Sequence, residues 1–226
     1  MMFDVEQWVC ELQNKILAAF GSKLLFLGYQ GSYRRKEATE NSDIDIVAIF
    51  ESLGVSELKK YRQIIESMPY KEKACGFISS KKEIKNWSKN ELFQLYYDTK
   101  PVYGSLENFI PKITDEDAIL AVQAGAQNIY HLSCHSYLYS SDKKDSLNGL
   151  FKCIFFVLQA KYFCENKKYI FAKSDLLKYL SAREKKILEI SINRHKIKDY
   201  NEEEVDEAYK LLIDFCSDNI KFNNYL

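Results

Sequence analysis

Residues Gly31–Phe50 read GSYRRKEATENSDIDIVAIF, a polar segment that leads into an apolar run. The segment begins with a Gly-Ser pair directly after another apolar run, LLFLGYQ (Leu24–Gln30), and Asp43 and Asp45 lie where the second run begins. Both apolar runs predict buried strands. A glycine after a strand lets the backbone approach a ligand closely, because it has no Cβ atom. The stretch therefore predicts either a ligand site or a plain turn between two strands.

The two aspartates favour the ligand site. Asp43 and Asp45 are two residues apart at the entry of a strand, so their side chains point to the same face. Two carboxylates on one face repel each other unless a cation or a proton lies between them. Mg²⁺ binds carboxylates together with substrate phosphates. Ser32 is expected to cap a short helix through Tyr33–Glu37, whose N-terminus would attract phosphate.

Together, the Gly-Ser pair and the aspartates resemble the signature of nucleotidyltransferases of the DNA polymerase β superfamily. The small bacterial branch, which includes aminoglycoside and lincosamide nucleotidyltransferases, reads roughly GSxARGxAxxxSDIDL. The matching residues in this chain are Gly31, Ser32, Arg35, Glu37, Ala38, Ser42, Asp43, Ile44 and Asp45. The resemblance implies Mg²⁺-dependent transfer of a nucleoside monophosphate from an NTP, expected to be ATP, to an acceptor hydroxyl, with release of pyrophosphate.

The resemblance also implies a role for each site residue. Gly31, Ser32, Arg35 and Ser42 would bind the nucleotide, and Asp43 and Asp45 would be catalytic and hold two Mg²⁺ ions. Arg35 has an alternative as a solvated charge, because charged residues flank it on both sides.

Two departures from the family pattern bear on the site, at Lys36 and at the third carboxylate. Lys36 stands where the family usually has glycine, so the turn after the short helix must differ or be slightly strained. Active members carry a third carboxylate on the next strand, here KACGFIS (Lys73–Ser79), whose middle has no acid. Glu72 is the first candidate for this catalytic carboxylate, with a surface residue as its alternative. Asp98 is the second candidate, with a turn at a strand edge as its alternative.

The pattern of the whole chain predicts an α/β (α+β) domain with a small mixed sheet, followed by an all-α helical bundle. Apolar runs and helical spacings alternate up to Pro111, and long helical patterns follow, at roughly 115–140, 145–166, 173–181, 183–194 and 202–220. We expect a nucleotidyltransferase domain over residues 1–110 and a helical, substrate-binding-like domain over residues 111–226.

The helical half resembles the substrate-binding domain of antibiotic-modifying members. In aminoglycoside enzymes, carboxylates on its first helix bind the cationic drug. Here the comparable helix carries Gln123, Gln127 and His131, with no acid between Asp117 and Asp142, which argues against an aminoglycoside. His131 and His135 have zinc-compatible spacing but no third ligand, so polar surface residues or a His131 general base are the alternatives. Tyr169 and Lys173 are weaker candidates to line a site.

The composition limits which functions, partners and cellular locations are expected. Lys plus Arg equal Asp plus Glu at 32 each, so a large basic nucleic-acid surface is not expected. Six scattered cysteines without a CxxC pair indicate a reduced, cytoplasmic protein, and neither a membrane span nor a secretory signal is expected. A homodimer is compatible with the sequence. The partners are an NTP and an unidentified small-molecule or protein acceptor. Two alternatives stay open, a catalytically degenerate nucleotide-binding module and an antitoxin-like transferase.

Overall fold

The structure is a computed structural model that describes residues 3–223. The chain divides into two compact units, Met1–Ser88 with Leu95–Ile113 and Lys89–Gln94 with Thr114–Leu226. Sequence reasoning put the boundary near residue 110. In the structure, helix α5 (Lys89–Asp98) is divided between the units: Lys89–Gln94 groups with the helical unit, and the rest of the helix groups with the first unit.

The first unit is built on a four-stranded mixed sheet with the strand order β3-β2-β1-β4. Strand β1 is antiparallel to β2 and β4, and β2 is parallel to β3. The strands are β1 (Leu24–Gln30), β2 (Ile44–Phe50), β3 (Ala74–Ser80) and β4 (Lys100–Tyr103). The predicted fold class, a small mixed sheet followed by helices, is confirmed.

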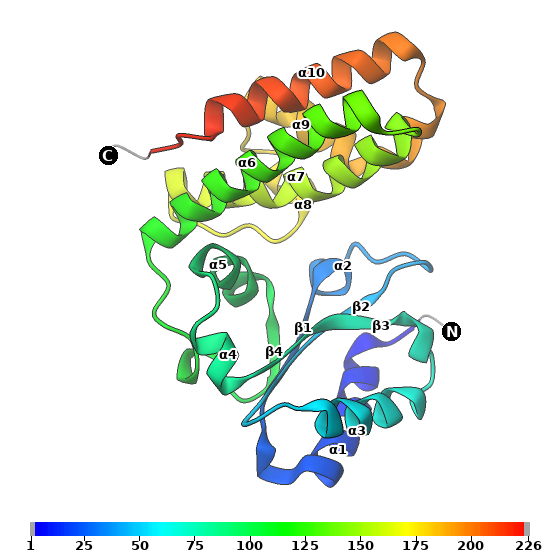
Figure 1. The fold of residues 1–226 in the computed structure, drawn as a ribbon, viewed down its shortest axis with the longest axis vertical. Helices are drawn as coiled ribbons and strands as arrows, with labels where there is room; N and C mark the ends of the chain where they lie inside the picture. The colour runs from blue at the N-terminus through cyan, green and yellow to red at the C-terminus, as the bar shows by residue number, and fades with distance from the viewer. Residues whose placement is uncertain (1–2, 224–226) are drawn as a thin grey trace. The chain divides into compact units, whose positions relative to one another are not determined.

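Helices α1 (Val5–Phe20) and α3 (Val55–Glu66) cover one face of this sheet (Figure 1). The Asp4 carboxylate caps α1 by accepting hydrogen bonds from the N–H groups of Glu6 and Gln7. Leu12 and Ile16 of α1 are fully buried in the core beneath the strands. The shorter helices α2 (Gly31–Arg35) and α4 (Lys81–Lys85) follow β1 and β3 directly.

The second unit is a bundle of helices around α7. Its helices are α6 (Asp115–Tyr139), α7 (Lys143–Asn166), α8 (Lys173–Leu176), α9 (Ala182–Ile192) and α10 (Glu202–Asn219). Of the described helices, only α7 is long and apolar enough to suit a membrane span, and 67% of its most apolar stretch is buried, as in a core helix. Capping boxes at Thr114/Asp117, Ser181/Glu184 and Asn201/Glu204 define the starts of α6, α9 and α10.

Two helices differ from expectation. The prediction that Ser32 caps a helix over Tyr33–Glu37 is wrong, because the turn out of β1 occurs at Gly31 and α2 spans Gly31–Arg35. The helix expected over residues 173–181 is only the single turn α8. The expected strain at Lys36 is confirmed. This residue ends α2 in the left-handed conformation, with φ of 60°, which glycine would adopt at lower cost.

Candidate functional site

The turn at Gly31 places the backbone directly against the carboxylate of Asp45. Gly31 follows strand β1 with φ of 73°, and a Cβ atom built on it would lie 1.9 Å from Oδ2 of Asp45. Strand pairing explains this proximity, because Gln30 at the end of β1 is the partner of Asp45 on β2. Glycine is therefore required here twice, for its backbone conformation and for the space that Asp45 fills.

Asp43 and Asp45 lie together at the start of β2. Asp43 is the exposed residue just before the strand, and Asp45, its second residue, is half-buried. Asp43 also faces Tyr33 of α2. Burial, reinforced by the Asp43 charge, raises the pKa of the Tyr33 hydroxyl. The structure thus brings Gly31, Asp43 and Asp45 into one site where β1 ends and β2 begins.

A third carboxylate, Asp98, reaches the same turn from the last residue of α5. Its Oδ2 atom accepts hydrogen bonds from Nη1 of Arg35 at 2.9 Å and from the N–H of Gly31 at 3.4 Å. The Asp98 side chain is 2% exposed, and its Oδ1 atom is buried with no hydrogen-bond partner. Burial raises the pKa of Asp98 to about 6, although Arg35, the Gly31 N–H and Arg34 oppose this, and Asp45 adds to it.

Arg35 is part of this buried cluster. Its side chain is 8% exposed and also pairs with Glu37, Nε to Oε2, at 3.2 Å. The alternative of a solvated surface charge is therefore wrong. Removal of one partner from a buried ion pair strongly destabilises the fold. Arg35 thus ties the end of α2 to the end of α5, whereas its contact with a nucleotide stays a prediction.

Asp98 should give the protein a measurable pH dependence. Its folded-state pKa of about 6 lies above the ordinary 3.8, so the folded chain holds this proton more tightly than the unfolded chain. The associated stability is present below pH ~4 and lost as the pH rises through about 6. Relative to Asp98→Asn, which cannot ionise, the wild type should lose about 3 kcal/mol of unfolding free energy between these limits. Urea unfolding of both proteins at a series of pH values measures the difference, and a constant difference would contradict the assigned burial.

Ser32 and Ser42 are the two serines predicted to bind the nucleotide. Ser32 is a half-buried residue of α2, and its carbonyl oxygen accepts a hydrogen bond from the N–H of Glu37 at 2.8 Å. The Ser42 hydroxyl accepts a hydrogen bond from the N–H of Thr39 at 2.8 Å. This hydrogen bond stabilises the loop that leads to Asp43 and the start of β2. The nucleotide-binding role of both serines stays a prediction.

Strand β3 does not bring an acid opposite the aspartates. The parallel pairing with β2 places Cys75 beside Asp45, and Cys75 is exposed. Glu72 lies before the strand, in the short 3₁₀ turn Lys71–Lys73, and is also exposed. Among the residues that the structure describes, no group of three His, Cys, Asp or Glu side chains could hold a metal ion. A site at β2 therefore has two carboxylates, with Asp98 already engaged by Arg35.

The candidates of the helical half lie in the second unit. His131 and His135 are exposed on α6, with ring centroids 6.0 Å apart. Gln123 donates a hydrogen bond to the carbonyl of Phe222, so it stabilises the bundle. His131 and His135 fit polar surface residues of a helix. The described chain groups no third metal ligand with the two histidines.

Comparison with known proteins assigns the family. A model of the nucleotidyltransferase domain matches residues 9–121, half of the 226-residue chain. The chain belongs to the nucleotidyltransferase domain family. The match includes the Gly31 turn, both aspartates and Asp98, and it confirms the superfamily indicated by the sequence.

One solved structure resembles this chain over nearly its whole length. It is a spectinomycin adenyltransferase from Enterococcus faecialis, crystallised with ATP and spectinomycin, and the similarity has a TM-score of 0.56 and 15% identity. The similarity covers 97% of this chain and 100% of the other. A sequence search of curated proteins finds no match. The helical half therefore belongs to the shared fold.

Sequence reasoning missed the connection between Arg35 and Asp98. The two residues are 63 positions apart and come from different helices, so no local pattern links them. The position of Cys75 beside Asp45 was also missed, because it depends on the register of β3 against β2. The only available signal was the absence of an acid in the middle of the strand.

Proposed function

We propose that this nucleotidyltransferase transfers AMP from ATP to a hydroxyl group of a small-molecule acceptor and releases pyrophosphate. The observation that carries the proposal is the contact between Gly31 and Asp45, with Asp43 at the same strand mouth. At this turn, phosphates could approach the backbone closely because glycine has no Cβ atom. The two carboxylates beside it could hold a metal ion. The solved adenyltransferase of similar fold, with ATP and an antibiotic in its structure, supports ATP and a small acceptor.

The aspartates fit a magnesium ion that binds together with the nucleotide. Mg²⁺ is usually held by one or two carboxylates and by substrate phosphates, which matches a donor set of Asp43 and Asp45 without a third acid. When bound, the ion would neutralise charge that develops on the phosphates during transfer. Two carboxylates suffice for one ion held in this way. The second ion implied by the family resemblance stays a prediction.

The transfer itself is an in-line displacement at the α-phosphorus. The acceptor hydroxyl oxygen forms a bond to this phosphorus, and the bond to the oxygen that bridges the α- and β-phosphates breaks. Pyrophosphate leaves with that electron pair, and the hydroxyl proton passes to a base or to water. The residues of this chain contribute by positioning the triphosphate at the Gly31 turn.

A carboxylate at position 75 should accelerate this transfer. Cys75 is exposed and pairs with Asp45, so Cys75→Glu places an acid beside the aspartates without filling buried space. We expect the transfer rate to rise by roughly 100-fold or more, the contribution typical of a well-placed general base. Cys75→Gln has a similar size without the charge and is the matched control. An equal rate in both variants would contradict the proposed place of the third carboxylate.

An acceptor panel tests the proposed function. The protein is incubated with ATP, Mg²⁺ and a set of hydroxylated small molecules, including antibiotics, and the products are separated by mass spectrometry. We expect one class of compound to gain a single AMP group, and to gain none with Asp45→Asn. Tight ATP binding without a product from any compound would favour a nucleotide-binding module instead.

Three further expectations remain predictions. The six cysteines are free in the structure, which supports the proposal of a reducing, cytoplasmic location. The balanced charge supports the proposal that nucleic acid is not the acceptor. A homodimer can be tested by light scattering.

A further inference from the structure

Helix α6 carries an exposed face without formal charge. Residues 118–141, which include most of α6, contain no Asp, Glu, Lys or Arg, although these make up 28% of the chain. Four large hydrophobic side chains are exposed on the same helix: Leu120, Leu132, Leu138 and Tyr139. A solvated helix face usually carries charged and polar residues. The composition of this face is instead typical of the centre of a protein–protein interface, which is depleted of charge.

The exposed face follows a regular stripe along α6. The buried side of the helix, where α6 packs on α7 and α10, consists of Ala118, Val122, Ala126, Ile129 and Ser133. On the opposite side, spacings of four and three residues alternate along the stripe Leu120, Ala124, Gln127, His131, Cys134 and Leu138. All six residues are exposed or half-buried. Alternate spacings of four and three residues are the pattern by which two helices pack along a shared seam.

The order of residue types in this stripe is the same from both ends. Each end has a leucine, the next position has a small side chain, and the two central positions are polar. A second copy of α6 can therefore pack antiparallel on the first, with a two-fold axis at the level of Ile129. The facing pairs are then Leu120 with Leu138, Ala124 with Cys134, and Gln127 with His131. The amide and the imidazole of the last pair can form a hydrogen bond.

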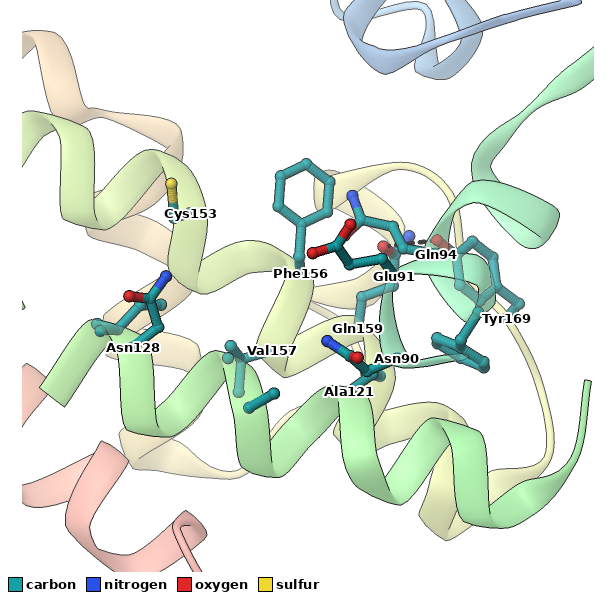
Figure 2. A pocket seen from close by; sticks show the side chains of 15 residues that line it. Asn90, Glu91, Gln94, Ala121, Asn128, Cys153, Phe156, Val157, Gln159 and Tyr169 are labelled. Carbon is teal, nitrogen blue, oxygen red and sulfur yellow. Dashed lines mark hydrogen bonds between the residues drawn. The ribbon is translucent and has the colours of Figure 1, made fainter. Parts of the chain in front are cut away.

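The positions that flank the stripe also suit a second copy. In a two-fold contact, a charged flanking residue would face the same charge on the other copy, and this face has no such residue. Ala121 and Asn128 lie on one flank and line a pocket of about 430 Å³ beside α7 (Figure 2). The antiparallel pairing places His135 of the second copy opposite Ala121, so its ring could enter this hollow.

We infer that this face of α6 forms a symmetric homodimer contact in which the α6 helices of two copies pack antiparallel. The partner is a second copy because the face matches itself under a two-fold rotation in size, polarity and charge. At 1.5 Å per residue, the stripe from Leu120 to Leu138 is about 27 Å long. One helix pair of this length lies at the low end of specific interfaces, so we expect a dissociation constant on the order of 10 µM. The inference does not depend on the proposed function.

A charge pair at the two ends of the stripe tests this contact. Sedimentation equilibrium measures the oligomeric state of the full chain, without nucleotide, from about 1 to 200 µM. We expect Leu120→Glu to raise the dissociation constant of the dimer at least ten-fold, because the new carboxylate would lose water against Leu138 at two symmetric places. Addition of Leu138→Lys should restore the constant to within about three-fold of the wild type, since opposite charges then face each other across the dimer. Within one copy the two positions are about 27 Å apart and cannot pair.

Leu58→Glu is the matched control. Leu58 is an exposed leucine on α3 in the first unit, so this substitution should leave the dimer unchanged. A protein that stays monomeric over the whole concentration range would overturn the inference, as would a dimer that Leu120→Glu leaves intact. Failure of Leu138→Lys to restore the dimer would overturn the antiparallel pairing.

A disulfide bond tests the same pairing independently. Residue 124 should face Cys134 of the other copy, so Ala124→Cys should form an intermolecular disulfide under mild oxidation. The wild type should form none through Cys134, because the two copies of this residue would be about 15 Å apart along the helix axes. Peptide mass spectrometry identifies the linked residues, since Cys10 and Cys153 are also exposed. A link between two Cys134 residues would contradict the antiparallel pairing.

Discussion

Asp45→Asn is expected to lower the affinity for Mg²⁺ and ATP at least 100-fold and to eliminate nucleotidyl transfer. The substitution keeps the shape of the side chain against Gly31 and removes only its charge. A metal ion that neutralises phosphates contributes several kcal/mol, and about 3 kcal/mol already corresponds to roughly 100-fold in affinity. Calorimetric titration with ATP, in the presence and absence of Mg²⁺, measures the effect.

Glu40→Gln is the matched control for this prediction. Glu40 is an exposed acid in the loop before the strand, and its carbonyl oxygen, which accepts a hydrogen bond from Lys73, is unaffected by the change. The control should bind ATP like the wild type. Unchanged affinity in Asp45→Asn would show that Asp45 does not hold the metal ion, and the site would need to be reassigned.

Gly31→Ala is expected to remove ATP binding and to destabilise the fold. The new Cβ atom would lie 1.9 Å from Oδ2 of Asp45, and φ of 73° is unfavourable for alanine. The backbone conformation alone costs on the order of 1–2 kcal/mol, and the displaced Asp45 adds to it. We therefore expect the midpoint of urea unfolding to fall, and the affinity for ATP to drop by about 100-fold or more even where the protein remains folded.

Gly149→Ala separates this effect from a general sensitivity to alanine. Gly149 lies in helix α7, and a Cβ atom on it would meet no atom within 4 Å. Alanine should be neutral or stabilising there by about 1 kcal/mol, in line with helix propensity. Wild-type ATP binding by Gly31→Ala would mean that the turn can relax without displacing Asp45, contrary to the packing described above.

Local patterns predicted the elements of this fold well. The period of two residues at Asp43 and Asp45 placed both carboxylates at one strand mouth. The apolar runs at Leu24–Gln30 and after the two aspartates predicted β1 and β2, and the strand expected over Lys73–Ser79 is β3. Each of these features depends on residues that are close in sequence.

The features that sequence reasoning missed depend on distant residues. Asp98 meets Arg35 only because the sheet brings the ends of α2 and α5 together. Cys75 lies beside Asp45 because of a parallel register that no local signal determines.

The most direct test of nucleotidyl transfer follows the separate phosphates of ATP. The protein is incubated with Mg²⁺, the panel of hydroxylated small molecules described above and ATP that carries a radioactive label on either the α- or the γ-phosphate. Transfer of AMP predicts that the α-label appears in the acceptor and the γ-label in pyrophosphate, with both reactions lost in Asp45→Asn. Appearance of the γ-label in the acceptor, or retention of both labels in ATP that the protein binds, would contradict nucleotidyl transfer at this site.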